Sequence, residues 1–261
     1  MSTNATDELL YETRDGIATI TFNRPKARNA LTFEMYDQLL IISTNLARDH
    51  RGISALIING AGDKAFAAGT DISRFREFTD DADAIAYEHR IDQVLSALES
   101  IPVPTVAAIR GACTGGGAAI AACCDLRIAS PDLKYGFPIA RTLGNCLSLN
   151  SLSRIASLLG EARTREIIFT SRLIKADEAS AIALVSEVVE DPLARARELA
   201  EQMKLHAPLT LQSTKEGLRR LRNSSSSLNS DDLITRCYGS NDFKEGLEAF
   251  LAKRPPNWTG T

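Results

Sequence analysis

Two small-residue segments of this 261-residue chain have compositions that suit backbone binding of a negatively charged atom. The segment from Gly111 to Ala119 reads GACTGGGAA, with three consecutive glycines after an apolar run. Glycine has no Cβ atom, so a ligand can approach the backbone closely, and the amides that open a helix have no partner within it. The positive end of the helix dipole then favours a phosphate, a carboxylate or an oxyanion that forms during a reaction. On spacing alone, such a turn is more often a device for packing a strand against a helix.

The second segment, KAFAAGTDI, runs from Lys64 to Ile72 and also follows a strand-like apolar run. It ends in a turn of small residues, and Thr70 in that turn precedes Gly116 by 46 positions. Neither turn alone specifies a function. The pair, each placed after an apolar strand, predicts two neighbouring sets of accessible backbone amides.

Five segments of the chain together resemble the motifs of the crotonase (enoyl-CoA hydratase/isomerase) superfamily. They are NRPKARNAL at 23–31, AFAAGTDI at 65–72, GACTGGGAAIA at 111–121, CDLRIA at 124–129 and FLAKRPP at 250–256. The matches occur in the family's order and extend over most of the chain. The resemblance implies an α/β fold, a crotonase-type ββα spiral core, with a helical C-terminal oligomerisation region.

The resemblance also implies a reaction centre made from the two glycine-containing turns. Members of this superfamily stabilise the enolate of an acyl-CoA thioester with two backbone N–H groups, which by position are those of Thr70 and Gly116. Charge develops on the thioester oxygen only as the reaction proceeds, so fixed donors favour the transition state. One such donor is typically worth about 100- to 1,000-fold in rate.

The same resemblance assigns residues to coenzyme A, which is part of the substrate, so that no separate cofactor is expected. The matching positions are Lys26, Ala27, Arg28, Ala68, Asp71 and Ile72 around the adenine, with Lys64 and Lys253 near the phosphates. Either lysine taken alone is more typical of a solvated surface residue, and only the surrounding motif favours a role in binding. Asp71 fits a turn or the CoA side better than a catalytic base.

The chain departs from the hydratase pattern at both positions of the usual acid and base. That pattern places one glutamate two residues after the triple glycine and another after the proline of an FGxPE segment. These positions are Ala119 and Ile139 here, and the sequence YGFP at 135–138 fixes the second alignment. Since a general acid or base typically contributes about 100- to 10,000-fold, hydration by the standard mechanism is not expected.

Replacement polar groups are available in the segment that follows, RTLGNCLS at 141–148. Arg141 suits binding of a substrate carboxylate, Asn145 suits orientation of water, and Cys146 suits an acid or nucleophile. A surface arginine, a helix-capping asparagine and a buried thiol are the structural alternatives. The three histidines, His50, His89 and His206, are expected in helices away from both turns and in structural roles.

Two classes of function remain open. One is an enzyme of CoA-thioester enolate chemistry, whether hydration, isomerisation, decarboxylation or a related lyase reaction. The other is a CoA-ester binding protein with little turnover. The enzyme is favoured, because an enolate-stabilising pair serves no purpose in binding alone. Decarboxylation and isomerisation also need fewer fixed proton-transfer groups than hydration.

The elements that must position these residues are predicted from hydrophobic periodicity. A hairpin is expected at 8–22, strands at 54–59, 106–109 and 125–129, and helices at 33–48, 84–99 and 118–124. Beyond residue 145 the chain is expected to be almost wholly helical, with helices at 161–170, 176–184, 192–206, 208–222, 231–237 and 242–252. A flexible serine loop is expected at 223–227. The spiral core is placed at 1–200, and the helical region at 201–261 is, by resemblance, the part that forms a homotrimer or a dimer of trimers.

Composition excludes several other classes of protein. A net charge of −3 without a Lys/Arg block disfavours nucleic acid as a partner. No apolar run reaches the roughly 18 residues of a membrane helix, and the acidic N-terminus lacks signal-peptide features, so a cytoplasmic protein is expected. Five cysteines without metal-ligand spacing predict buried thiols rather than disulfides or a metal site. The glycines match neither GxGxxG nor GK[ST], which excludes the Rossmann and P-loop mechanisms.

Overall fold

The N-terminal hairpin forms the edge of the larger sheet. In this computed structural model, which describes residues 8–223 and 231–259, β1 (Leu9–Arg14) pairs with β2 (Ile17–Phe22) in antiparallel register. Asp15 and Gly16 connect them with positive φ angles of 51° and 77°. The hairpin predicted from the alternating sequence is confirmed.

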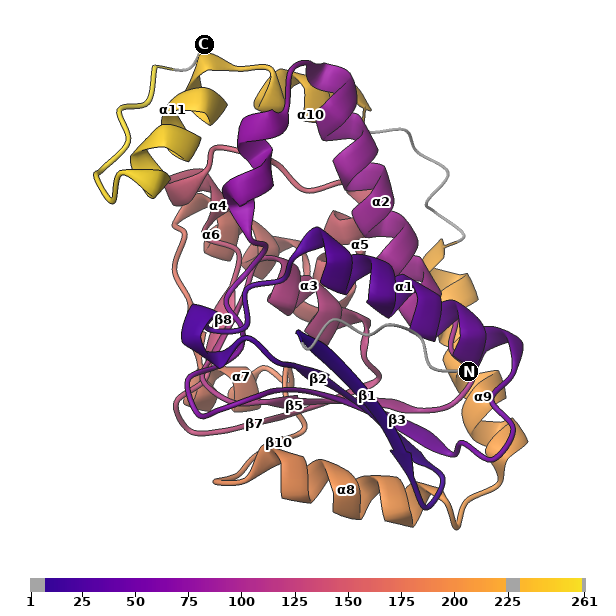
Figure 1. Cartoon of the computed structure of the whole chain (residues 1–261). Helices are drawn as coiled ribbons and strands as arrows, with labels where there is room; N and C mark the ends of the chain where they lie inside the picture. Colours follow the sequence, from indigo (N-terminus) through magenta and orange to yellow (C-terminus); the bar gives the residue numbers. More distant parts are fainter. Residues whose placement is uncertain (1–7, 224–230, 260–261) are drawn as a thin grey trace.

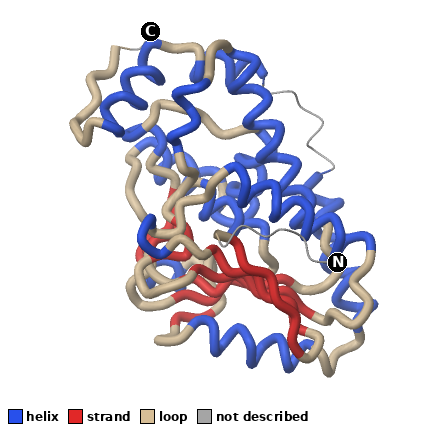
Figure 2. The backbone as a smooth tube through the Cα atoms, in the orientation of Figure 1, coloured by secondary structure: helices blue, strands red, loops and turns tan. Residues whose placement is uncertain are grey.

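The larger sheet is parallel beyond this hairpin. Its six strands lie in the order β1-β2-β3-β5-β7-β10. The added strands are β3 (Ala55–Gly60), β5 (Thr105–Ile109), β7 (Leu126–Ala129) and β10 (Glu187–Val188). Figure 2 shows this sheet as the band of strands between a group of helices above and one long helix below.

A second sheet is built from short strands in the order β4-β6-β8-β9. These strands are β4 (Ala65–Ala67), β6 (Ala112–Thr114), β8 (Lys134–Gly136) and β9 (Ile174–Lys175). Each of the first three follows a strand of the larger sheet and leads toward a helix, so the chain repeats a ββα unit. The predicted ββα architecture is confirmed. The prediction missed β4, β6 and β8, because three residues are too few to show an alternating pattern.

Helices cover both faces of the larger sheet (Figure 1). On one face lie α1 (Phe33–Arg48), α2 (Asp81–Glu99) and α3 (Gly116–Cys123), and on the other lies α8 (Pro192–Met203). Alternating side chains of the strands contribute to two hydrophobic clusters, one on each face of the sheet. Ile20 and Ile58 belong to the larger cluster, whereas Ile17 and Ile57 pack with residues of α8. Successive side chains of a strand point to opposite faces, so one sheet serves two apolar layers.

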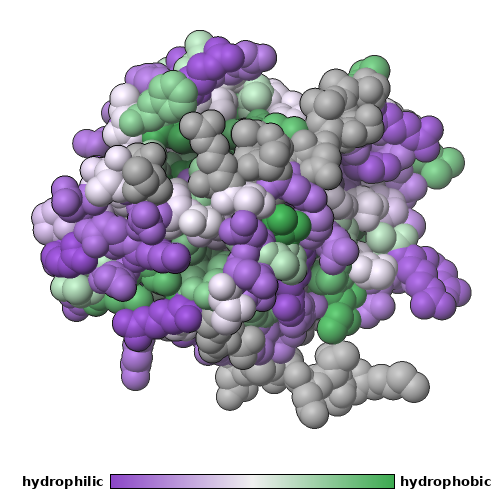
Figure 3. Space-filling view, turned by 90° about the horizontal axis from the view of Figure 1, so that it is seen from above, coloured by the Kyte–Doolittle hydropathy of each residue, from purple (hydrophilic) through white to green (hydrophobic). Residues whose placement is uncertain are grey.

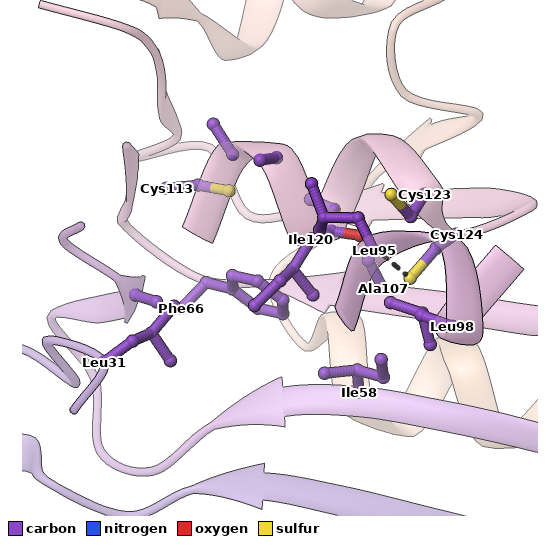
Figure 4. Packing of buried hydrophobic residues seen from close by; sticks show 14 of the residues in the cluster. Leu31, Ile58, Phe66, Leu95, Leu98, Ala107, Cys113, Ile120, Cys123 and Cys124 are labelled. Carbon is purple, nitrogen blue, oxygen red and sulfur yellow. Dashed lines mark hydrogen bonds between the residues drawn. The ribbon is translucent and has the colours of Figure 1, made fainter. Parts of the chain in front are cut away.

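The small residues of α3 allow it to approach the second sheet very closely. A Cβ atom on Gly117 would lie 2.4 Å from the carbonyl oxygen of Ala67 in β4, so only glycine fits there. Figure 4 shows the core beside this contact, where Ile120, Phe66 and Leu95 of three different elements belong to one cluster. The position of the triple glycine is therefore fixed by packing.

The remaining helices are η1 (Pro25–Ala27), η2 (Ile72–Glu77), α4 (Ile139–Thr142), α5 (Leu149–Leu159), α6 (Glu161–Phe169), α7 (Ala176–Ala181), α9 (Pro208–Asn223), α10 (Asp231–Tyr238) and α11 (Asn241–Leu251). Helices α6 to α11 correspond to the predicted series, whereas η1, η2, α4 and α5 were not predicted individually. In the described residues, the expected almost wholly helical second half is interrupted by β9 and β10, which are two residues long, and α7 and α8 end three residues earlier than expected. The serine loop falls mostly outside the described residues, at 224–227.

Two further observations concern the class of protein. In the part of the chain that the structure describes, no helix combines the length and apolar character needed to span a bilayer. The face that lies at the top of Figure 1 is mainly hydrophilic, with hydrophobic residues in small separate groups (Figure 3). All five cysteines are free; Cys113, Cys123 and Cys124 are buried as predicted, whereas Cys146 and Cys237 are only half-buried.

Candidate active site

The two glycine-containing turns meet because their strands are neighbours. β4, β6 and β8 pair in parallel, so their carboxyl ends lie along one edge of the second sheet. Thr70, Gly116 and Ile139 follow these three strand ends by only two or three residues. Three successive turns of the ββα repeat thus bring residues from distant parts of the sequence to one place.

The amides of Thr70 and Gly116 donate no hydrogen bond to any of the residues that the structure describes. Two adjacent amides are engaged: Asp71 N donates to Leu31 O at 2.8 Å, and Gly115 N donates to Gly136 O at 3.0 Å. Gly116 is the first residue of α3, so no helical carbonyl is available to its amide. Both N–H groups therefore remain available to an acceptor that is not part of the fold.

Hydroxyl groups surround the Thr70 side chain. Its Oγ1 lies 2.9 Å from the Tyr36 hydroxyl and 3.1 Å from that of Tyr87. A Cβ atom on Gly116 would lie only 2.0 Å from Tyr36 Oη, so glycine is required here by contact as well. Burial raises the pKa of Tyr36 and of Tyr87, and both phenols stay neutral.

A cavity of about 140 Å³ lies between these two turns. Apolar side chains make most of its wall: Ile72, Phe75, Ile91, Leu143, Leu147 and Phe250. Ala119 and Ile139, the positions of the two hydratase glutamates, also line it and are only 7% and 9% exposed. The chain therefore carries aliphatic side chains in the places where a paired acid and base would face the cavity.

A carboxyl group that the sequence analysis missed lies in the same wall. Glu88 of α2 lines the cavity and is 4% exposed, and the Tyr238 hydroxyl donates to its Oε1 at 2.5 Å. Burial, reinforced by the charge of Asp92, raises the pKa of Glu88 to about 7, although bonds from Tyr238 and the Ser148 backbone lower it. The sequence signal was a glutamate three residues before Ile91, within the buried stripe of an amphipathic helix.

The three predicted substitutes lie in different environments. Asn145 lines the cavity, and its Nδ2 donates to the Tyr238 hydroxyl at 3.2 Å. Its Oδ1 is buried without a partner among the described residues. Cys146 lies instead in an adjacent groove with Cys237, and its pKa is raised by a hydrogen bond to that thiol and by burial. Arg141 is exposed on α4 and is not part of the cavity wall.

The three histidines stand apart from the cavity, as predicted, although two of them are not helical. His89 of α2 is 57% exposed on its side chain and hydrogen-bonds Asp231 at 3.1 Å. His50 and His206 lie in loops after α1 and α8, because those helices end at Arg48 and Met203. The prediction that placed them in helices is wrong for these two.

The residues assigned to coenzyme A form part of the surface around the turns. Lys26, Ala27 and Arg28 are exposed at η1, and the Ala68 amide donates to Arg28 O at 3.0 Å, which joins two of the predicted segments. Lys64 is exposed, and Ile72 lines the cavity.

Asp71 and Lys253 complete this set. The Asp71 carboxylate pairs with Arg24 at 3.0 Å and caps η2, so it has the turn role that was expected. Lys253 is exposed three residues beyond Phe250, which contributes to the cavity wall.

Several residues of the recognised motifs hold the backbone in place. Asn29, which is fully buried, donates to Ala61 O at 2.9 Å and Ala65 O at 2.8 Å, and so ties the first motif to β4. Arg127 donates to Leu184 O at 2.7 Å and Cys124 O at 2.6 Å. These motifs therefore position the turns that flank the cavity.

Comparisons with known proteins agree with this arrangement. The family model described as enoyl-CoA hydratase/isomerase matches residues 12–261. The short-chain-enoyl-CoA hydratase of Clostridium acetobutylicum is 31% identical, with 95% of this chain and 96% of that protein covered. The crotonyl-CoA hydratase of Syntrophomonas wolfei is 32% identical, with 97% and 98% covered.

Solved structures show the same similarity. An enoyl-CoA hydratase/carnithine racemase from Magnetospirillum magneticum has a TM-score of 0.78 at 35% identity, covering 98% of this chain and 97% of that one. A methylmalonyl-CoA decarboxylase in complex with 2-nitronate-propionyl-CoA has a TM-score of 0.87 at 28% identity, covering 98% and 100%. The match of the family model over nearly the whole chain establishes that this protein belongs to the enoyl-CoA hydratase/isomerase (crotonase) family.

Proposed function

We propose that this protein is an enzyme that stabilises the enolate of an acyl-CoA thioester between the amides of Thr70 and Gly116. The observation that carries the proposal is that these two amides donate to no acceptor among the described residues and border one apolar cavity. A thioester oxygen placed between them would receive two hydrogen bonds. Those bonds strengthen as the oxygen becomes negative, which is the requirement for catalysis.

The surroundings favour such an oxyanion. The walls are largely apolar, and hydrogen bonds in a site that excludes water are stronger than the same bonds in water. Tyr36 and Tyr87 are neutral phenols whose hydroxyls hold Thr70 at 2.9 and 3.1 Å, so they fix the turn without adding negative charge. The donors are therefore in place before the reaction begins.

The size of the cavity suits the acyl end of the substrate. Its volume of about 140 Å³ is below the ~300–1,000 Å³ of sites that enclose a drug-sized ligand. Coenzyme A would then lie along the exposed surface beside it, where Lys26, Arg28 and Lys64 offer positive charge to its phosphates. We assign the pantetheine end to the opening of the cavity and expect short acyl groups within it.

The reaction would not be hydration by paired glutamates, because Ala119 and Ile139 transfer no proton. Isomerisation or decarboxylation of a CoA thioester needs fewer fixed groups and is the better match. A CoA-ester binding protein with little turnover is the second candidate, favoured by the same two aliphatic residues. A homotrimer or dimer of trimers is also proposed.

The oxyanion role is tested by removing one donor while relieving the most severe clash. Gly116→Pro deletes the N–H but would bring Cβ against Tyr36 Oη, so it is made in a Tyr36→Phe background, with Tyr36→Phe alone as the matched control. Proline is tolerated at the first position of a helix. We expect the double variant to lose about 100-fold or more in turnover relative to the control. Turnover within about threefold of the control, with a native circular dichroism spectrum, would contradict the assignment.

A further inference from the structure

We propose that Glu88 is the proton-transfer residue of this cavity, acting on the carbon chain of the bound thioester in place of glutamates at 119 and 139. This inference rests on the proposed enolate chemistry and adds the base that the chemistry needs. Glu88 comes from α2, whereas positions 119 and 139 belong to α3 and α4. The catalytic carboxyl would therefore enter from a different wall.

Position is the first argument. Within the described residues that line the cavity, Glu88 is the one carboxyl group, and no histidine, lysine or cysteine accompanies it. The preceding residue, Tyr87, bonds to Thr70 Oγ1 at 3.1 Å, so this turn of α2 is attached to the turn that carries one oxyanion donor. The Tyr87–Thr70 hydrogen bond thus links the helix that carries Glu88 to the turn that carries the Thr70 amide.

Hydrogen bonding is the second argument. Tyr238 of α10 donates to Glu88 Oε1 at 2.5 Å and accepts from Asn145 Nδ2 at 3.2 Å. The buried Oδ1 of Asn145, which lacks a partner among the described residues, lies in the wall of the same cavity. A buried polar atom without a partner is costly unless something satisfies it, and a bound substrate or water would do so. Tyr238 is a positioning residue in this arrangement.

The charge environment allows Glu88 to exchange a proton near neutral pH. The groups around it are Tyr36 of α1, Tyr87 and Asp92 of α2, Tyr238 of α10, and Cys146 and the Ser148 backbone of the segment before α5. Asp92 is paired with Arg154 at 3.3 Å, which limits its repulsion of Glu88. Burial outweighs the bonds from Tyr238 and Ser148, and the pKa of Glu88 rises to about 7. A pKa near the working pH suits a group that must accept a proton and then return it.

A single carboxyl group is sufficient for a 1,3-proton shift. With a 3-enoyl thioester, the Glu88 carboxylate takes a proton from C2, and the C2–H electron pair forms the C1=C2 bond of a dienolate. Its negative charge lies on the thioester oxygen, facing the amides of Thr70 and Gly116. The Glu88 acid then returns the proton to C4: the C3=C4 pair forms the new C4–H bond, the C1=C2 pair moves to C2=C3, and a lone pair of the oxygen restores the C1=O bond. No water and no second acid take part.

The experiment uses the full chain with 3-hexenoyl-CoA and follows the absorbance of the 2-enoyl product. Glu88→Gln removes the titrating group at constant shape, and Glu12→Gln on the exposed strand β1 is the matched control. We expect Glu88→Gln to lose about 100-fold or more in kcat. Its Kd for butyryl-CoA by calorimetry should remain within about threefold of the unaltered protein, because binding and proton transfer use different groups. Glu12→Gln should be unchanged in both measurements.

Tyr238→Phe supplies a readout that a purely structural role would not give. The Tyr238 hydrogen bond lowers the pKa of Glu88, so its loss should move the acid limb of the kcat/KM profile to higher pH. Glu88→Asp keeps a carboxyl group and should retain partial activity, with an acid limb in its kcat/KM profile. This variant tests the role of the carboxyl group even if Glu88→Gln folds poorly. An unshifted profile in Tyr238→Phe, or an Asp variant without any pH dependence, would contradict the inference.

The outcomes separate this inference from the function on which it rests. If the protein binds butyryl-CoA and isomerises 3-hexenoyl-CoA while Glu88→Gln does so at a similar rate, the Glu88 role is overturned and the enolate proposal stands. If the unaltered protein binds butyryl-CoA without isomerisation, the Glu88 role is also overturned, and the binding-protein alternative is favoured. If it binds no thioester, both proposals fall.

Discussion

Ala119 and Ile139 are the residues that most limit the chemistry of this protein. Both line the cavity, and neither side chain can move a proton. Among the described lining residues the carboxyl is that of Glu88, which comes from a helix whose sequence predicts only an amphipathic stripe. Local sequence predicted the departure from the hydratase pattern. It could not predict the replacement, because which face of α2 meets the glycine turns is decided by packing between distant segments.

The first prediction at this scale concerns hydration. Crotonyl-CoA hydration by the unaltered protein should be slower than that of a typical hydratase by a factor of about 10⁴ or more, since neither usual proton-transfer group is present. The double change Ala119→Glu with Ile139→Glu should raise the rate, with some loss of stability because two carboxyls are buried near each other. The hydration rate is measured by the loss of the enoyl absorbance. The control is the double variant Ala119→Gln with Ile139→Gln. Rapid hydration by the unaltered chain would show that this account of the cavity is wrong.

The second prediction concerns stability and Glu88. Its pKa is raised from 4.5 to about 7 in the fold, so between these values the folded state binds more protons than the unfolded state. Stability therefore falls as pH rises from about 4.5 to about 7, by roughly 3 kcal/mol, and changes little above that through this group. Glu88→Gln should remove this decline. Urea unfolding at pH 5 and pH 8 measures the difference, and an equal decline in both proteins would exclude Glu88 as its source.

At the scale of elements, the close packing of α3 against β4 determines where the glycine turn lies. Long periodic segments such as α1 and α2 were predictable from sequence, with α2 beginning three residues earlier than expected. The strands β4, β6 and β8 were not, yet their parallel pairing is what joins Thr70, Gly116 and Ile139. Such pairing depends on contacts far apart in sequence, which no local pattern records.

Gly117 provides the test at this scale. Gly117→Ala would place Cβ 2.4 Å from Ala67 O, so α3 must move away from β4. We expect a loss of stability of about 1–3 kcal/mol, together with reduced turnover because the Gly116 amide moves with the helix. Gly217→Ala in α9 is the matched control, because it meets nothing within 4 Å and should stabilise the protein by about 0.5–1 kcal/mol. Thermal unfolding of the two variants should shift in opposite directions, and a neutral Gly117→Ala would refute the packing argument.

At the scale of the whole molecule, the chain folds so that three repeats of one unit present their turns at a single edge. The family and the ββα architecture were predictable from motifs spread from residue 23 to residue 256. Those motifs largely hold the backbone in place, as Asn29 and Arg127 do through hydrogen bonds to carbonyls. The C-terminal helices contribute Tyr238 and Phe250 to the site, a contribution that sequence could not reveal because it depends on where α10 and α11 dock.

The central claim is that the cavity between Thr70 and Gly116 forms a thioester enolate. Exchange of the C2 protons of butyryl-CoA in deuterated buffer tests it most directly, because exchange requires the enolate but no particular product. We predict that the protein at pH 8 adds deuterium at C2, seen as a mass increase of the recovered thioester, and that Gly116→Pro in the Tyr36→Phe background does so about 100-fold more slowly. Butyryl-CoA that is bound by the unaltered protein, yet recovered with no more deuterium than in enzyme-free buffer, would contradict the claim.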